Sequence, residues 1–389
     1  MTAVAQDRLP LALTGVKILD FSTLLPGPLA TLLLAESGAT VLQIERPPGG
    51  DEMRSYTPRL GESSANYALL NRGKQSAAVD LKDPATRDRL LELAAEADVV
   101  VEQFRPGVMD RLGLGYEAVR RVSPAIIYCS ISGYGQTGPD ARRAGHDLNY
   151  LAESGLLGSV VDEQGDPHLP PTLIADIAGG TYPAVVNILL ALIRRNATGA
   201  GCHLDIGMTP NLSTLAYGHL ATHAGTGAWP IPGRDLLTGG SPRYAIYRTA
   251  DGRHVAAAPL EDRFWDRFCA LIELPQELRD HVGRDAEVIA DVTARIAARD
   301  AEYWRELFNE EDVSCSIVAT FEEAAQAQTL RTESPYRLTG DDFDVSALPV
   351  PVVDALRASP SPLPYPPVRM GPAALTFGRQ SPNGPEVSH

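Results

Sequence analysis

Two side chains near the middle of the sequence have the chemistry to move protons. His146 stands in Ala-Gly-His-Asp-Leu-Asn-Tyr, residues 144–150, just before a run with a helical pattern. Asp176 follows an apolar run and precedes two glycines, a setting in which an unpaired carboxylate is costly to bury. Simpler interpretations stay open, because His146 could cap or pack the helix, and Asp147 or Asp176 could be an ordinary N-cap.

Two other patterns give only weak evidence for a ligand or metal site. Residues 133–138, Gly-Tyr-Gly-Gln-Thr-Gly, match Gly-x-Gly-x-x-Gly, but a dinucleotide site needs that pattern in the first βα turn, which here reads Thr-Leu-Leu-Pro-Gly-Pro at 23–28. The loop therefore favours close backbone approach to some other ligand. His219 and His223 are four residues apart on a predicted helix, yet they lack the His-Glu-x-x-His pattern of a zinc site, so surface or core histidines are favoured.

Basic residues are expected at the ends of successive predicted strands: Arg46, then Arg72 and Lys74, then Arg105. In an open α/β sheet the carboxyl ends of the strands face the ligand crevice, and arginine donates paired hydrogen bonds to phosphate. Each of the four could instead pair with one of the 49 acidic residues. Together, in a chain of formal net charge −15, they indicate a phosphate-bearing ligand.

The composition limits the remaining classes. The excess of acid makes a nucleic acid or an anionic membrane an unexpected partner. The four cysteines (129, 202, 269 and 315) form no Cys-x-x-Cys pair and are expected to be reduced thiols. No signal peptide is recognisable, and the apolar stretch 182–193 is too short to span a bilayer. We expect a cytoplasmic protein.

Strands and helices alternate in the first part of the chain, which predicts a parallel sheet in a Rossmann-like fold. The expected strands are 16–21, 40–44, 75–81, 98–102 and 125–132, with helices at 29–37, 84–97 and around 116–121. Further helices are expected at 181–195 and 208–226.

A second, smaller α+β domain is predicted after the Gly/Pro-rich passage 225–242. It begins with a hairpin over 244–256 that turns at Asp251-Gly252, and it continues with helices at 264–272, 286–299 and 301–309. The expected divisions are a large Rossmann-like domain over 1–205, a linker helix over 206–230, the small domain over 231–335, and a return to the large domain with a loose Pro-rich tail over 336–389.

Several segments together resemble the family III CoA-transferases and their α-methylacyl-CoA racemase relatives. They are Leu-Asn-Arg-Gly-Lys-Gln-Ser at 70–76 with Asp-Leu-Lys at 80–82, Phe-Arg-Pro-Gly-Val at 104–108, Leu-Gly-Leu-Gly-Tyr at 112–116 and the glycine loop continued to Pro139. The resemblance extends through most of residues 14–275. Gln103, where the family often has asparagine, and the segment 241–247 depart from it.

The resemblance implies a homodimer of two interlinked rings and an acyl-CoA substrate, with no metal or redox cofactor. It also implies a set of CoA-binding residues: Arg46, Asn71, Arg72, Lys74, Arg105, Gly107, Gly145 and Tyr150. Asp176 matches the family's catalytic aspartate, and His146 is typical of the racemase branch. Glu261 is similar to a racemase glutamate that reaches the histidine from the other subunit.

These residues lead to a mechanistic hypothesis. His146 and Asp176 would exchange a proton on opposite faces of the α-carbon of a thioester, with Glu261 orienting the histidine. The backbone N–H of Asp147 would stabilise the enolate oxygen. Three alternatives stay open: acyl transfer through a covalent Asp176 intermediate, binding of acyl-CoA without turnover, and a Rossmann oxidoreductase.

Overall fold

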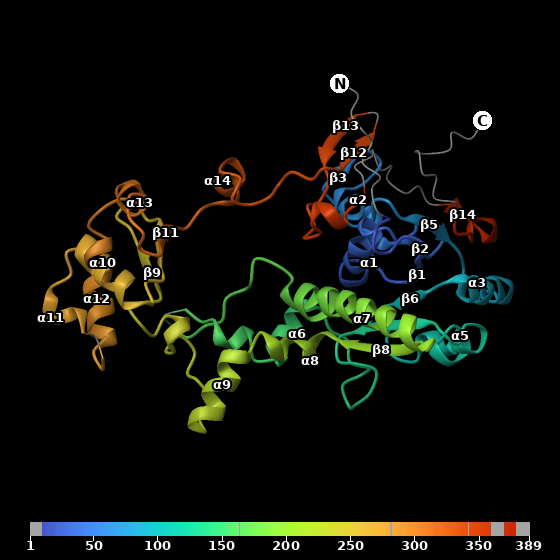
Figure 1. Ribbon diagram of the computed structural model, residues 1–389, viewed down its shortest axis with the longest axis horizontal. Coiled ribbons are helices and arrows are strands. Elements are labelled where there is room, and N and C mark those ends of the chain that lie inside the picture. Colours follow the sequence, from blue (N-terminus) through green and yellow to red (C-terminus); the bar gives the residue numbers. More distant parts are fainter. Residues whose placement is uncertain (1–9, 163, 281, 341, 359–368, 379–389) are drawn as a thin grey trace. The chain divides into compact units, whose positions relative to one another are not determined.

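The computed structural model describes residues 10–162, 164–280, 282–340, 342–358 and 369–378. The chain divides into two compact units (Figure 1). Unit 1 takes residues 1–154, 171–214 and 331–389, and unit 2 takes 155–170 and 215–330. The residues expected to form a linker helix, 206–230, are thus shared between the units. Of the expected return and Pro-rich tail over 336–389, residues 341, 359–368 and 379–389 lie outside the described residues.

Unit 1 is built on a seven-stranded sheet in which every neighbouring pair is parallel. The strand order is β14-β5-β2-β1-β6-β7-β8. The bounds are β1 Lys17–Asp20, β2 Thr40–Glu45, β5 Gln75–Ala78, β6 Val99–Glu102, β7 Ile127–Ser132, β8 Cys202–Gly207 and β14 Arg369–Met370. Without β14 this is the 3-2-1-4-5-6 order of the dinucleotide-binding fold, whose crevice opens where the chain reverses direction, between β1 and β6. The predicted parallel α/β sheet is confirmed.

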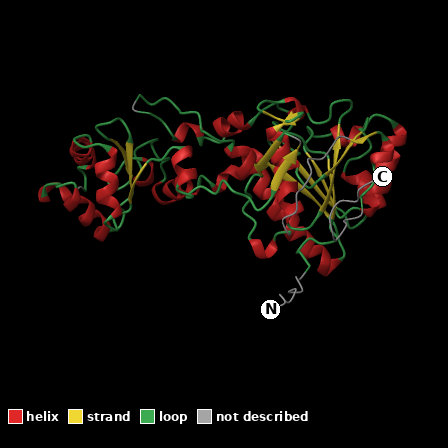
Figure 2. Ribbon diagram, turned by 90° about the horizontal axis from the view of Figure 1, so that it is seen from above, coloured by secondary structure: helices red, strands yellow, loops and turns green. Residues whose placement is uncertain are grey.

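Helices cover both faces of this sheet (Figure 2). α1 (Pro26–Glu36) and α7 (Tyr182–Thr198) pack together on one face, and α3 (Pro84–Glu96) and α5 (Tyr116–Val122) pack together on the other. Shorter elements of unit 1 are α2 (Ala65–Asn71), α4 (Val108–Arg111), α6 (Asp147–Glu153), α8 (Met208–Asn211) and the hairpins β3 (Arg59–Leu60) with β4 (Ser63–Ser64) and β12 (Arg337–Gly340) with β13 (Phe343–Ser346). The 3-10 turns are η1 (Glu52–Ser55), η4 (Leu212–Thr214), η6 (Asp354–Leu356) and η7 (Pro372–Ala374).

A π-helical segment, η3 (Ala175–Thr181), runs directly into α7. Within the described residues, Ala175–Thr198 is the one helical segment that is long and apolar enough to cross a membrane, judged by length and composition alone. Its inner residues, among them Ala184 and Ile188, are buried against the rest of unit 1, as expected of a core helix. Its outer side exposes Val186, Leu190 and Ile193.

Unit 2 is an α+β unit with a three-stranded antiparallel sheet in the order β11-β10-β9. The predicted hairpin is present as β9 (Ala245–Arg248) and β10 (His254–Ala257), whereas β11 (Cys315–Ile317) was not expected. The remaining elements are α9 (Tyr217–Thr226), α10 (Asp262–Leu271), α11 (Gln276–Arg279), α12 (Asp285–Ile296), α13 (Ala301–Asn309), α14 (Phe321–Gln326), η2 (Leu157–Ser159) and η5 (Leu236–Thr238).

One expected helix was wrong. The sequence indicated a single helix over 208–226, but α8, η4 and α9 divide this segment. The break falls after α8, between Leu212 and Tyr217. There the Ser213 hydroxyl donates to the Pro210 carbonyl at 2.9 Å, a local side-chain bond that competes with the helical ladder.

Candidate active site

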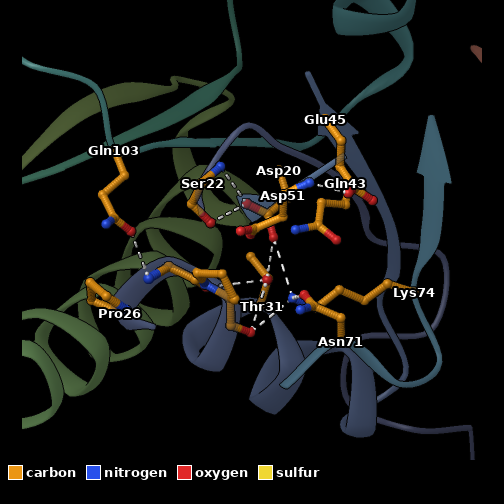
Figure 3. A network of polar contacts seen from close by, with 12 residues as sticks. Asp20, Ser22, Pro26, Thr31, Gln43, Glu45, Asp51, Asn71, Lys74 and Gln103 are labelled. Carbon is orange, nitrogen blue, oxygen red and sulfur yellow. Dashed lines mark hydrogen bonds and ion pairs between the residues drawn. The ribbon is translucent and has the colours of Figure 1, made fainter. Parts of the chain in front are cut away.

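The start of α1 lies at the reversal point of the unit 1 sheet. Gln103, immediately after β6, accepts a hydrogen bond through Oε1 from the backbone N–H of Gly27 at 3.1 Å (Figure 3). At the end of β1, the Asp20 carboxylate accepts hydrogen bonds from the backbone N–H of Ser22 at 2.9 Å and from the hydroxyl of Thr31 on α1. The crevice edge of the sheet and the first turn of α1 are therefore fixed to each other.

The same end of α1 is also fixed to η3. The hydroxyl of Thr181 donates to the Pro26 carbonyl at 2.9 Å. A Cβ added to Gly179 would stand 2.4 Å from the carbonyl oxygen of Met208, and one added to Gly180 would stand 3.1 Å from the Met208 and Pro26 side chains. The two glycines that follow Asp176 thus allow close packing, and they place this aspartate beside the crevice.

Asp176 lies within the π-helical turn, where it does not cap a helix. Its backbone N–H donates to Oδ1 of Asp147 at 2.9 Å. Burial, reinforced by the negative charge of Asp147, raises the pKa of the Asp176 carboxyl to about 7. Among the described residues neither carboxyl has a recorded ion pair. At neutral pH Asp176 can therefore both accept and donate a proton, as an acid/base catalyst must.

His146 is the residue directly before α6, and Asp147 is the first residue of that helix. The side chain of His146 is exposed, whereas Asp147 is buried. The backbone N–H of His146 donates to Oδ1 of Asn149 at 3.0 Å, which fixes the helix start. Through the bond between Asp147 and Asp176, the structure brings the His146 segment next to η3. The first N–H groups of a helix have no acceptor within it, so the Asp147 N–H points out of the start of α6.

The predicted glycine loop packs on Tyr150. A Cβ on Gly133 would lie 2.5 Å from this ring, and one on Gly145 would lie 2.6 Å from it. The Tyr150 hydroxyl donates to the Gly145 carbonyl at 2.6 Å, and the ring of Tyr134 stands edge-on to Tyr150 with 5.4 Å between centroids. These glycines therefore admit a tyrosine pair beside Asp176, whose charge contributes, after burial, to the raised pKa of Tyr150.

Asn71 and Lys74 correct one of our expectations. They precede β5, so they are not at the carboxyl end of a strand. Lys74 is buried, and its Nζ bonds to Oδ1 of Asn71 at 2.8 Å and the Pro28 carbonyl at 2.8 Å, with Asp20 at 3.5 Å (Figure 3). Burial, partly offset by Asp20, lowers the pKa of Lys74 to about 8. Both side chains stabilise the interior, and we no longer propose them as direct CoA ligands.

Arg72 requires the same correction. Its guanidinium is 1% exposed, pairs with the buried Glu36 and donates to the Leu348 carbonyl at 2.8 Å. A buried pair of this kind neutralises both charges and leaves no free fork for a phosphate. Arg72 therefore connects α1 to the returning C-terminal segment.

The other two basic residues lie where they were expected. Arg46 directly follows β2 and Arg105 lies three residues after β6, and both side chains are exposed. Gly107, before α4, has φ +81°, a conformation that a residue with a Cβ rarely adopts. Arg46, Arg105 and the turn at Gly107 thus stay available for an anionic ligand at the crevice edge.

The remaining candidates belong to unit 2. Glu261 is the exposed residue before α10, where it lies at the end of the 255–260 run. On α9, the ring of His223 stacks on Trp229 with 4.1 Å between centroids. In the described part of the chain, no three His, Cys, Asp or Glu side chains are grouped so that they could hold a metal ion.

Sequence reasoning missed two contributors to this site. The side chain of Asp147 was considered only as a cap, yet it accepts the N–H of Asp176. Tyr134 was treated only as a loop position, yet its ring covers Tyr150. The sole sequence signal for Asp147 was a second acid beside His146, and this does not identify a partner 29 residues away.

Comparisons with known proteins show the family that the chain resembles. The family described as CoA-transferase family III matches residues 13–366. Human alpha-methylacyl-CoA racemase is 34% identical over 358 residues, which cover 90% of this chain and 89% of the relative. Human succinyl-CoA:glutarate CoA-transferase is 39% identical over 269 residues, which cover 68% of this chain and 60% of the relative.

Solved structures show the same fold. The crystal structure of Rv3272 from Mycobacterium tuberculosis superposes with a TM-score of 0.78 at 26% identity, covering 92% of this chain and 97% of that one. Racemases and CoA-transferases both occur among the relatives, at similar identity. The chain belongs to CoA-transferase family III.

Proposed function

We propose that this enzyme inverts the α-carbon of a 2-methyl-branched acyl-CoA by moving a proton from one face of that carbon to the other. The observation that carries the proposal is the half-buried Asp176, whose pKa is raised to about 7 and which lies next to the helix start that bears His146. A carboxyl with this pKa is partly ionised at neutral pH, so it can act as a base toward one enantiomer and as an acid toward the other.

The proposed steps conserve protons and electrons. The Asp176 carboxylate removes the α-proton, and the C–H electrons move to the thioester oxygen to give an enolate. The His146 imidazolium then donates a proton to the opposite face, and the roles reverse for the other enantiomer. The Asp147 N–H would donate a hydrogen bond to the enolate oxygen, where preset donors are most effective because charge develops there.

Binding of the CoA part is proposed for the crevice edge. Arg46 and Arg105 are exposed cations in an acidic chain, suited to the phosphates. Gly107, Gly145 and Tyr150 would shape the path toward Asp176. The likeness to the racemases also supports a homodimer in which Glu261 of the partner subunit approaches His146, with no cofactor beyond the CoA of the substrate. A cytoplasmic location is proposed with it.

The second candidate is CoA transfer between carboxylic acids, in which the Asp176 carboxylate attacks the thioester carbonyl, the C–S bond breaks, CoA leaves as its thiolate, and Asp176 becomes a mixed acyl anhydride. The 39% identity to a human CoA-transferase favours keeping it. In that reaction the nucleophile must be ionised, and the raised pKa of Asp176 leaves a smaller fraction ionised than an ordinary aspartate would have.

One experiment separates the two functions. The purified protein is incubated in D2O with (2R)- and (2S)-2-methyldecanoyl-CoA and no free acid. Inversion predicts one deuterium at the α-carbon and convergence of the two stereoisomers. The convergence should be lost in His146→Gln, whereas the exposed control His168→Gln should keep both. No deuterium, together with acyl transfer to an added acid and an Asp176 adduct trapped by hydroxylamine, would establish the transferase instead.

A further inference from the structure

The two strands that flank β1 in the unit 1 sheet both end in a buried glutamate, and each glutamate precedes an exposed arginine of the crevice edge. Glu45 is the last residue of β2 and is followed by Arg46. Glu102 is the last residue of β6, and Arg105 lies three residues after it. Glu45 is 3% exposed and Glu102 is 4% exposed. Because glutamate is almost never buried without a partner, the contacts of both side chains need an explanation.

The contacts of Glu45 show what such a residue can do. Its Oε2 accepts the backbone N–H of Asp51 at 2.6 Å, and the Gly50 N–H donates to the Arg46 carbonyl at 2.9 Å. Arg54 pairs with the same carboxylate at 2.6 Å. Glu45 therefore fixes the loop that begins with Arg46, and a buried base is paired with it.

Glu102 makes the same kind of contact with the turn over residues 103–107. Its Oε2 accepts the backbone N–H of Phe104 at 2.9 Å, and the Ser130 hydroxyl of β7 also bonds to its carboxyl group. No ion pair of Glu102 is recorded among the described residues. The carboxyl group is thus held by a backbone amide and a hydroxyl, and one of these two partners belongs to the turn.

The hydrogen bond to Phe104 lies at the point of the turn that directs Arg105. At the start of the turn, Oε1 of Gln103 accepts the Gly27 N–H at 3.1 Å, and at its end the Val108 N–H donates to the Arg105 carbonyl at 3.0 Å. Phe104 itself packs against the hydrophobic core. Since the direction of the Phe104 N–H follows the backbone rotation at this residue, the bond to Glu102 also sets the direction in which the chain presents the next residue.

Arg105 is placed to meet a ligand. Its side chain is exposed, and no ion pair of it is recorded in the part of the chain that the structure describes. Burial is the main cause of the raised pKa of Tyr150, and the positive charge of Arg105 partly offsets this rise. Arg105 is therefore within electrostatic reach of the tyrosine beside Asp176. An arginine makes its paired hydrogen bonds to phosphate only when the planar guanidinium is correctly oriented.

We propose that Glu102 is a positioning residue: by holding the Phe104 amide, it keeps Arg105 in the orientation that binds the phosphates of a CoA ligand. The side chain of Glu102 is buried, so its influence on the ligand passes through Arg105. The inference rests on the proposed role of Arg105 in CoA binding. It does not depend on whether the reaction is inversion or transfer, because both reactions use a CoA thioester.

The test compares two unreactive thioethers, S-decyl-CoA and S-decyl-pantetheine, of which the second has no phosphate. Titration calorimetry on the full-length protein measures both dissociation constants. Glu102→Leu removes the acceptor of the Phe104 N–H, so it should weaken S-decyl-CoA binding by roughly fivefold or more. Binding of S-decyl-pantetheine should stay within about twofold of wild type, because this ligand offers nothing for Arg105 to hold.

A conservative variant separates the hydrogen bond from the charge. Glu102→Gln keeps an oxygen that can accept the Phe104 N–H. Burial raises the pKa of Glu102 to about 7, so a neutral side chain is tolerated at this position. Its affinity for S-decyl-CoA should therefore stay within about threefold of wild type. The matched control is Glu92→Gln, which alters an exposed acid of α3 and should have no effect.

A double-mutant cycle distinguishes this inference from the proposed CoA site. Arg105→Met alone should weaken S-decyl-CoA binding by roughly tenfold or more, and adding Glu102→Leu should then cost less than about twofold. Unchanged affinity in Arg105→Met would refute the proposed CoA site, and the inference with it. A weakened Arg105→Met in which Glu102→Leu keeps its full effect would refute the inference alone, as would an equal loss of both ligands in Glu102→Leu.

A second variant covers the case in which Glu102→Leu does not fold. Ser130→Ala removes one oxygen, the one that bonds to the Glu102 carboxyl group. It should weaken S-decyl-CoA binding by about twofold to fivefold, because the carboxyl group is then less well oriented toward the Phe104 N–H. S-decyl-pantetheine binding should not change. If the folded Ser130→Ala protein bound S-decyl-CoA as tightly as wild type, Glu102 would not be a positioning residue.

Discussion

Two groups of carboxyl side chains in unit 1 are shielded from water, Asp176 only in part, and they differ in whether a base is paired with them. Asp20 and Glu45, at the ends of β1 and β2, are each paired with a buried base. Lys74 lies 3.5 Å from Asp20, and Arg54 lies 2.6 Å from Glu45. Asp147 and Asp176 have no recorded ion pair among the described residues, and they face each other's charge instead.

The consequence appears in the protonation of each group. Burial opposes the ionisation of Glu45, but the hydrogen bonds and charge of Arg54 outweigh it and lower the pKa of this carboxyl. Burial of Asp176 is uncompensated, and Asp147 adds to it, so the pKa rises. A carboxyl group thus provides a fixed charge in one place and a mobile proton in the other, depending on whether a base is buried beside it.

The largest expected effect comes from removing the mobile proton. Asp176→Asn keeps the size of the side chain but cannot ionise. Exchange of the α-proton should therefore fall by about 10²–10⁴-fold, the usual contribution of a general acid or base, for the enantiomer that Asp176 deprotonates. The rate of deuterium uptake measures this. The exposed control Asp88→Asn should retain full activity, and a fall of less than tenfold in Asp176→Asn would remove this residue from the mechanism.

The second largest effect is expected on stability, when the buried ion pair between Lys74 and Asp20 is broken. Lys74→Met leaves the Asp20 carboxylate buried without its base, and breaking a buried pair in this way costs about 3–5 kcal/mol of unfolding free energy. Urea denaturation followed by circular dichroism measures the loss. Lys17→Met is the matched control because Lys17 forms an exposed pair with Glu96, whose removal should cost less than about 1 kcal/mol. Equal losses in both variants would show that burial of the pair is unimportant.

The sequence predicted the strands and helices better than it predicted which side chains contact each other. Alternating apolar strands and amphipathic helices identified five of the parallel strands, because burial on both faces leaves a strong local pattern. β14 has two residues, Arg369 and Met370, and both are exposed, so it carries no such pattern. β8 alternates partly buried and exposed residues at the sheet edge and was missed as well.

In the candidate site, too, local segments were predicted correctly while some side-chain contacts were not. Resemblance selected Asp176 and His146, and their segments do lie side by side. It also assigned Arg72 and Lys74 to a ligand, although both are buried against Glu36 and Asp20. Whether a basic residue meets a ligand or an internal acid depends on contacts between residues up to 54 positions apart, and local sequence does not encode these.

A smaller effect is expected on stability, with a defined pH dependence. The native pKa of Asp176 is raised to about 7 from its ordinary 3.8, so the native state binds more protons than the unfolded state between these values. Stability therefore falls as pH rises through this range and stays low above it. Asp176→Asn removes this penalty and should stabilise the protein by about 1–3 kcal/mol at pH 8. Denaturation at pH 4 and pH 8 measures the gain, which should vanish at pH 4; a destabilised variant at pH 8 would contradict the raised pKa.

The smallest effect isolates the influence of one acid on the other. Asp147→Asn keeps an oxygen that can accept the Asp176 N–H, but it removes the negative charge that raises the pKa of Asp176. The acid limb of the exchange rate, measured for the enantiomer that Asp176 deprotonates, should therefore move to lower pH by about 0.5–1 unit, equivalent to roughly 1 kcal/mol. Asp140→Asn, which alters an exposed acid paired with Arg143, should leave the limb unchanged. Burial is the larger cause of the raised pKa of Asp176. If Asp147→Asn moved the acid limb to the pH of an ordinary aspartate, the charge of Asp147 would have to be the larger cause instead.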